Sequence, residues 1–154
     1  MSITHRAYEK ATRYCSYQDR TEKEVRTKLR ALGVMQEAEV AQLIQTLKAE
    51  KFLDEERYVA SFVRGRLVGK QWGKRKIQLA LAGKGVDSAL VSKELAAIED
   101  ADYLHTLREV ATKKKQGLAG KDSRQDRQKL TNYLLQKGYE PDLVYPTVQE
   151  LVGE

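Results

Sequence analysis

The sequence predicts an all-α fold built from three tandem three-helix repeats. One pattern occurs three times, in which an amphipathic run is followed by a glycine and then by an apolar residue. The glycines of the three copies are Gly33, Gly85 and Gly138, which lie 52 and 53 residues apart. Apolar residues recur at helical spacing in most other stretches, and no alternating run is bounded by hairpin turn residues. Such a period is typical of stacked units that form an elongated body.

The period divides the 154-residue chain into three units, which we place at residues 1–52, 53–99 and 100–154. A unit of about 50 residues is too small to bury a comfortable core of its own. We therefore expect the units to pack on one another, as the units of repeat proteins do.

The first unit opens with a helix predicted over residues 3–17, where apolar side chains recur every three to four positions. Thr21 and Glu24 are spaced as a capping box, in which each side chain accepts a bond from the other residue's backbone amide. The next helix should end at Gly33, because glycine readily adopts the left-handed conformation that stops a helix. The third helix carries the apolar residues Val40, Leu43, Ile44 and Leu47.

The second unit begins at Asp54, an N-cap residue followed by two glutamates that suit the positive end of a helix dipole. Its first helix should break at residues 71–73, which read Gln-Trp-Gly. The second helix should stop at Gly85, and Asp87 should cap the third helix.

The third unit should begin near Asp100 or Asp102 and continue through a polar connection over residues 113–122 to a helix capped by Ser123. Pro141 suits the first turn of the last helix. Pro146 does not suit a helix interior, because it removes a donor and clashes with the preceding turn. We expect a kink at Pro146 or a helix that starts late.

The charge balance favours an anionic partner. The formal net charge is +6, and the isoelectric point is about 9.3; both favour polyanions or anionic surfaces. A single cysteine excludes an internal disulfide and any multi-cysteine metal site. There is no signal-peptide core and no apolar run of membrane-spanning length, so we expect a cytoplasmic protein without a membrane partner.

The strongest candidate binding segment runs from residue 57 to residue 86 and contains no acidic residue. Residues 74–76 would place three basic side chains in the first turn of a helix, where a bound anion would offset their repulsion by the helix dipole. Trp72 either stacks on a base or fills the corner between two helices, and we favour the corner. The candidate binding residues are Arg57, Arg64, Arg66, Lys70, Trp72, Lys74, Arg75, Lys76 and Lys84.

A second basic cluster surrounds the connection of the third unit, where Asp122 and Asp126 dilute its charge. A flexible loop that follows phosphates and a merely solvated linker fit this pattern equally well. The cluster consists of Lys113, Lys114, Lys115, Lys121, Arg124 and Arg127.

The chain offers no constellation of catalytic or metal-binding residues. His5 and His105 are isolated from one another and from any ligand spacing. Cys15 lies on an apolar helical face, which favours a buried structural thiol over a nucleophile. Residues 83–85 read Gly-Lys-Gly but lack the spacing and the preceding strand of a phosphate-binding loop. We therefore expect a protein that is not an enzyme and that needs no cofactor or metal.

Three segments together resemble the RecX regulatory family. Residues 51–58 read KFLDEERY, residues 72–77 read WGKRKI, and the run from Arg20 through Thr21 and Glu24 to Gly33 completes the pattern. No single segment is diagnostic, but their order and spacing are specific, and the resemblance covers nearly the whole chain.

The resemblance implies a curved, elongated body that modulates the RecA recombinase. Members of the family lie in the groove of the RecA filament on single-stranded DNA and inhibit its strand exchange, ATP hydrolysis and co-protease activity. They have no catalytic activity. The implied partners are therefore the RecA filament and, through it, single-stranded DNA, in DNA repair and the SOS response. Nothing in the sequence requires a dimer, so we expect a monomer.

Two other functions remain open from the residues alone. One helix pair could act as a free-standing helix-turn-helix reader of nucleic acid, although the chain lacks a cluster of side chains suited to base edges. Alternatively, the protein could be a helical adaptor whose charge serves only solubility.

Overall fold

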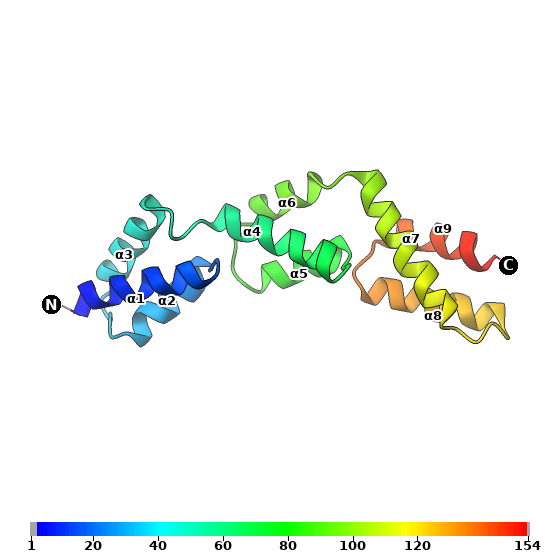
Figure 1. Ribbon diagram of the computed structural model, residues 1–154, viewed down its shortest axis with the longest axis horizontal. Coiled ribbons are helices and arrows are strands. Elements are labelled where there is room, and N and C mark those ends of the chain that lie inside the picture. The colour runs from blue at the N-terminus through cyan, green and yellow to red at the C-terminus, as the bar shows by residue number, and fades with distance from the viewer. Residues whose placement is uncertain (1–2, 154) are drawn as a thin grey trace.

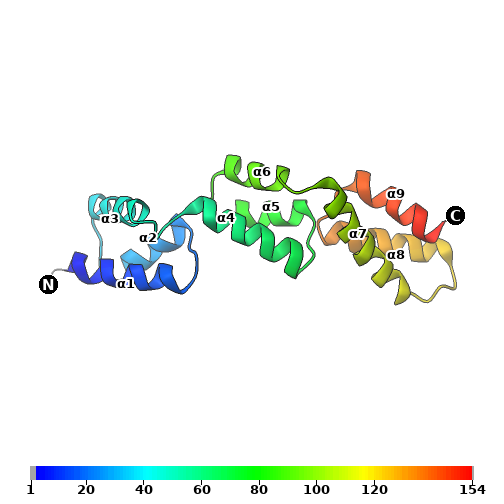
Figure 2. The ribbon, with the colours of Figure 1, turned by 45° about the horizontal axis from the view of Figure 1, so that its top comes forward.

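The protein is an elongated, gently curved row of three helical repeats. The structure is a computed structural model that describes residues 3–153. Helices are the only regular secondary structure among these residues. The repeats follow one another along the long axis, with the termini at opposite ends (Figures 1 and 2). The prediction of an all-α fold with tandem three-helix repeats is confirmed. Repeat 1 contains α1 (Ile3–Tyr17), α2 (Glu22–Ala31) and α3 (Glu37–Ala49); repeat 2 contains α4 (Glu55–Arg64), the π-helix η1 (Gly65–Gly69), α5 (Lys74–Ala82) and α6 (Ser88–Ala96); repeat 3 contains α7 (Asp100–Gln116), α8 (Ser123–Gln136) and α9 (Pro141–Val152).

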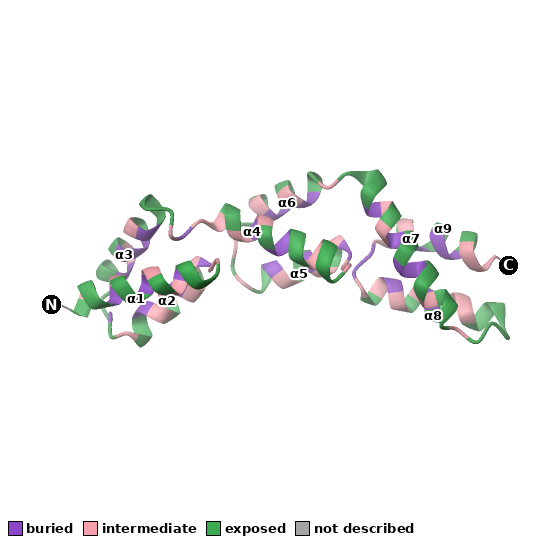
Figure 3. Ribbon diagram, viewed as in Figure 1, coloured by how far each residue is buried: buried purple, intermediate pink, exposed green. Residues whose placement is uncertain are grey.

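Each repeat has its own apolar core, formed by the faces of its three helices (Figure 3). Leu29, Ile77 and Leu134 are fully buried, one in each core. Burying such a side chain contributes about 1.5–3 kcal/mol. Leu67 and Ile98 contact the cores of both repeat 2 and repeat 3, so these two repeats share apolar contacts at their joint.

The predicted helix caps of the first two repeats are present. Thr21 and Glu24 form the reciprocal capping box at the start of α2. The carboxylates of Asp54 and Asp87 accept hydrogen bonds from backbone amides at the starts of α4 and α6. These bonds satisfy amides that a helix leaves without partners in its first turn.

The three repeat glycines all lie in the left-handed region, as the sequence predicts. Their φ angles are 99° at Gly33, 72° at Gly85 and 103° at Gly138. After α2 and α8 the turn is a Schellman motif, with Val34 N–H donating to the Leu29 carbonyl and Tyr139 N–H to the Leu134 carbonyl, at 3.0 and 3.2 Å. Each of these turns reverses the chain and places an apolar residue in the core.

The connection expected over residues 113–122 is shorter than the sequence predicts. Helix α7 continues through three lysines to Gln116, and Gly117 follows it. Lysine is a good helix former and is favoured near the negative end of the helix dipole. The expected cap at Ser123 is also wrong, because Asp122 caps α8 and Ser123 is its first helical residue.

The late start expected for the last helix is wrong as well. Helix α9 begins at Pro141 and continues past Pro146 to Val152. Val144, Thr147 and Val148 on its inner face are buried, so packing offsets the hydrogen bond that Pro146 removes. A bend at Pro146 remains a prediction.

Repeat 3 docks on repeat 2 through backbone hydrogen bonds at the start of α5. The Gly73 amide donates to the Lys137 carbonyl at 2.8 Å, and the Arg75 amide donates to the Gly138 carbonyl at 3.0 Å. The Tyr139 hydroxyl donates to the Gln71 carbonyl at 2.8 Å. The turn that ends α8 therefore supplies acceptors to a helix of the preceding repeat.

Repeat 1 meets repeat 2 through side chains instead. The Arg57 guanidinium on α4 forms a 2.7 Å ion pair with Asp19 and donates to the carbonyls of Lys51 and Phe52. The Gly85 turn of repeat 2 lies near Lys23 on α2, since a Cβ added at Gly85 would lie 3.7 Å from the Lys23 Cδ. The Gly85 turn and the Gly138 turn thus both face the second helix of the preceding repeat.

We predict that Gly73→Ala destabilises the joint between repeats 2 and 3. A methyl group at Gly73 would overlap the Gly138 carbonyl and the Tyr139 amide, although the φ of Gly73 is an ordinary −78°. Overpacking of this kind typically costs about 1–3 kcal/mol, which urea unfolding would measure.

Gly65→Ala is the matched control, because a methyl group there meets nothing within 4 Å and the φ of Gly65 is −62°. It should leave stability unchanged or raise it by about 0.5–1 kcal/mol. Equal unfolding midpoints for the two variants would show that the joint does not depend on this close approach.

Candidate nucleic-acid interface

Three cations surround Trp72 at the turn between η1 and α5. The Arg66 Cζ lies 5.4 Å, the Lys70 Nζ 5.8 Å and the Lys76 Nζ 4.4 Å from the centroid of the Trp72 ring. The ring is half-buried and packs against the core of repeat 2, which holds it in place. Each cation over an exposed ring face gains about 0.5–1 kcal/mol. Trp72 therefore fills a corner and also organises the positive charges around it.

Arg66 and Lys84 extend this positive charge toward repeat 1. The Arg66 Cζ lies 4.3 Å and the Lys84 Nζ 5.8 Å from the centroid of the Phe62 ring. The Arg66 Nε is buried and has no hydrogen-bond partner among the described residues. Aromatic packing rather than a carboxylate holds this guanidinium, so its charge is not neutralised by an ion pair.

Repeat 3 contributes Lys137 and Lys113 to the same surface. The Lys137 Nζ donates to the Lys70 carbonyl at 2.9 Å. Burial, and then the charges of Lys76 and Lys113, lower the pKa of the Lys137 ammonium. Sequence reasoning missed Lys137, although it precedes the repeat glycine Gly138 as Lys84 precedes Gly85.

The positive surface continues along the groove between α5 and α8. Arg75 and Lys76 line this groove of about 460 Å³ together with Leu79 and Leu135. The Leu79 side chain, on α5, is 74% exposed. We call these residues together the basic surface: Arg66, Lys70, Trp72, Arg75, Lys76, Lys84, Lys113 and Lys137.

Three amides at the start of α5 are hydrogen-bonded to the next repeat. The Lys74 amide donates to the Tyr103 hydroxyl at 2.9 Å, and the hydroxyl donates to the Glu140 carboxylate. The amides of Gly73 and Arg75 also donate hydrogen bonds to carbonyls of repeat 3. Acceptors from the next repeat thus compensate the basic first turn at three of its amides.

Three of the residues expected to bind lie away from the basic surface or at its margin. Arg57 is held at the joint of repeats 1 and 2. Arg64 lines a groove on another side of α4, together with Glu94 and Asp102. The Lys74 Nζ lies 4.8 Å from the centroid of the Tyr103 ring, within the joint of repeats 2 and 3.

The second basic cluster does not form one site. The Lys115 Nζ donates to the Leu151 carbonyl at 2.6 Å, and the Arg127 guanidinium donates to the Gly153 carbonyl at 2.7 Å. These bonds satisfy carbonyls at the end of α9. The Lys114 Nζ lies 4.7 Å from the Tyr133 ring centroid. Lys121 and Arg124 are exposed near the turn before α8, so only Lys113 joins the basic surface.

The remaining chemistry of the described residues is structural. Cys15 is buried, as predicted, and burial raises the pKa of its thiol. Residues 3–153 bring together no group of three or more side chains of the types that ligate metals. Within the same range, every helix is too short or too polar to cross a lipid bilayer.

Comparisons with known proteins identify the family. Models of the first, second and third three-helix domains of RecX match residues 7–47, 54–95 and 100–147. The regulatory protein RecX of Oceanobacillus iheyensis is 31% identical over 148 residues, which is 96% of this chain and 54% of that protein. The regulatory protein RecX of Clostridium acetobutylicum is 32% identical over 139 residues, which is 88% of this chain and 64% of that protein. The chain therefore spans between half and two thirds of the length of these relatives.

Solved structures agree with this assignment. The crystal structure of RecX from Lactobacillus salivarius superimposes with a TM-score of 0.88 at 29% identity, covering 97% of this chain and 96% of that one. A second crystal structure of a regulatory protein RecX has a TM-score of 0.84 at 24% identity, with 96% of this chain and 73% of that chain covered. The second likeness supports the fold alone.

We predict that the joint between repeats 2 and 3 loses stability in alkali. Burial, and then the Glu140 carboxylate, raise the pKa of Tyr139 to about 12, above the value of about 10 for an unfolded tyrosine. The folded state therefore holds a proton that the unfolded state releases, so this contribution is full below about pH 10 and is lost between about pH 10 and 12.

Tyr139→Phe should make the alkaline fall in the free energy of unfolding shallower, as measured by urea unfolding between about pH 8 and 11.5. The exposed Tyr145 provides the control, and Tyr145→Phe should follow the unmodified protein. Identical slopes for all three proteins would show that Tyr139 is not the group responsible.

Proposed function

This chain belongs to the RecX family of regulatory proteins, and we propose that it binds the RecA filament on single-stranded DNA and inhibits the filament's activities. In this proposal the basic surface makes the central contact. The protein acts by occupying the filament rather than by catalysing a reaction.

The observation that carries the proposal is the continuity of the basic surface across two repeats. Residues 57–86 contain no acidic residue, and Lys113 and Lys137 of repeat 3 add charge beside Lys76. Several cations spaced along a rigid body can contact successive phosphates of one strand, and each contact releases counterions. Trp72 lies among these cations as an aromatic platform on which a base can stack.

The elongated shape also supports a filament partner. The repeats form a row rather than a globule (Figure 1), so the surface available for contact is long relative to the volume of the protein. A filament repeats along its axis, and a row of repeats can contact several of its subunits. Bound in this way, the protein would oppose the movements that ATP hydrolysis and strand exchange require.

We predict that Lys70→Glu combined with Arg75→Glu weakens inhibition of RecA. Both side chains are exposed and neither has an ion-pair partner among the described residues. Reversing two charges that face phosphates should raise the concentration for half-inhibition of DNA-dependent ATP hydrolysis about tenfold, or about 1.4 kcal/mol. A titration of RecA ATPase on single-stranded DNA at two salt concentrations measures this.

The control is Arg64→Glu combined with Lys93→Glu, which changes the net charge by the same amount. Arg64 faces the groove on the other side of α4, and Lys93 forms an exposed ion pair with Glu56, which contributes little to stability. This control should inhibit like the unmodified protein. Equal loss in both variants would mean that net charge alone governs binding, and no inhibition by any of them would contradict the proposal.

Trp72 is the single tryptophan of the chain, so its fluorescence should report binding directly. We predict that a single-stranded oligonucleotide quenches this fluorescence and that the apparent affinity falls steeply with salt. A duplex of defined sequence that binds more tightly than any single strand, without RecA, would instead favour the free-standing helix-turn-helix reader.

A further inference from the structure

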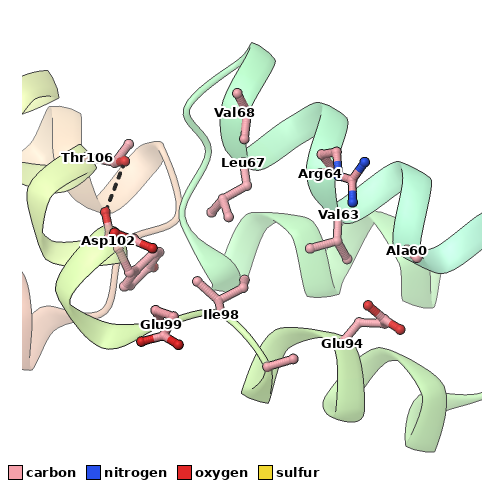
Figure 4. Close-up of a pocket in the computed structure, with 12 residues that line it drawn as sticks. Ala60, Val63, Arg64, Leu67, Val68, Glu94, Ile98, Glu99, Asp102 and Thr106 are labelled. Carbon is pink, nitrogen blue, oxygen red and sulfur yellow. Dashed lines mark hydrogen bonds between the residues drawn. The ribbon is translucent and has the colours of Figure 1, made fainter.

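An apolar groove of about 510 Å³ lies between repeats 2 and 3 (Figure 4). Its floor is formed by Val63, Leu67 and Ile98, and Val68 of the π-helix stands at its edge. Val68 is 72% exposed, so its side chain is open to solvent. The volume is within the range of sites that bind small ligands or a few side chains of a peptide.

The rim of the groove is acidic. Glu94, Glu99 and Asp102 surround it, and Arg64 is the one basic residue in its lining. Among the described residues, none of these four side chains takes part in an ion pair or a side-chain hydrogen bond. The Thr106 hydroxyl donates to the Asp102 backbone carbonyl and not to the Asp102 carboxylate. Three carboxylates against one guanidinium leave a local charge of −2 in a chain whose net charge is +6.

The groove and the basic surface lie on different sides of the same helix. Arg64 faces the groove, whereas Arg66 faces Phe62 and Trp72. Arg66 lines a different pocket, together with Lys84. A partner in the groove would therefore leave the basic surface free.

We propose that this groove binds a short basic segment of a partner protein, with one or two large apolar side chains in the groove and flanking lysines or arginines on the acidic rim. The inference goes beyond the proposed function and does not depend on it. It assigns a second interaction surface to the same protein.

The chemistry of the groove selects this occupant over others. Nucleic acid would bring phosphates against Glu99 and Asp102, and like charges at an interface repel one another. A wholly apolar ligand would bury the edge of the groove but leave the carboxylates without compensation. A segment with both apolar and basic residues satisfies the floor and the rim together.

The π-helix forms one wall of the groove. Gly65 and Gly69, which begin and end η1, would meet nothing within 4 Å even with a Cβ. Single turns of π-helix occur frequently at functional sites. Val68 lies on this segment and is exposed, whereas its neighbour Leu67 packs against the cores of repeats 2 and 3.

A library of displayed random peptides of about 12 residues tests the proposal. The library would be selected on the full chain and counter-selected on Val68→Asp, whose exposed position makes the substitution compatible with folding. We expect enriched peptides to combine Leu, Ile, Met or Phe with flanking Lys or Arg. Enriched peptides without basic residues, or no enrichment over the counter-selection, would overturn the proposal.

The affinities of the enriched peptides, measured by fluorescence anisotropy, locate the site. Val68→Asp and the triple variant Glu94→Gln, Glu99→Gln, Asp102→Asn should each weaken binding at least tenfold. The double variant Lys70→Glu, Arg75→Glu should bind the peptides like the unmodified protein, and Val68→Asp should still inhibit RecA. These opposite controls distinguish a failure of this inference from a failure of the proposed function.

Sedimentation velocity provides the remaining test. If the unmodified protein self-associates and Val68→Asp abolishes the association, a second copy of the chain fills the groove and the proposed partner is wrong. Monomers in both cases, together with the expected peptide binding, support it.

Discussion

The structure depends most on the contact between the Gly138 turn and the first turn of α5. The Gly73 and Arg75 amides donate hydrogen bonds to the carbonyls of Lys137 and Gly138. A Cβ at Gly73 would overlap the Gly138 backbone, and a Cβ at Gly138 would overlap Lys76. Backbone bonds of this kind have fixed directions, so they set the orientation of repeat 3 on repeat 2. The shared contacts of Leu67 and Ile98 then add apolar burial to a geometry that the backbone has already determined.

This contact also explains how a helix can begin with Lys74, Arg75 and Lys76. The start of α2 in repeat 1 is capped by its own side chains, Thr21 and Glu24. At the start of α5 the next repeat supplies the acceptors, including the Tyr103 hydroxyl that bonds the Glu140 carboxylate. Because repeat 3 compensates the helix dipole, the side chains of Arg75 and Lys76 are free to join the basic surface. The joint and the basic surface are therefore two consequences of one arrangement.

The same joint separates two surfaces of opposite charge. Cations gather around Trp72 on one side, and carboxylates surround the apolar groove on the other. A globular domain of this size would bury much of both, whereas a row of small cores leaves them exposed. The row of repeats thus leaves both surfaces accessible.

The repeats could be predicted from the sequence because the signals that define them are local. A capping box at Thr21, an Asp cap at Asp54 and a left-handed glycine at Gly138 each depend on a few neighbouring residues, and all are present in the structure. The basic segment could also be predicted, because residues 57–86 contain no acidic residue. Which charges act together, in contrast, depends on how the repeats pack. Packing directs Arg57 to Asp19 and Arg127 to the end of α9. It also brings Lys137 beside Lys70 and provides partners for three amides at the start of α5. These outcomes depend on partners distant in the sequence, and helical periodicity carries no information about them.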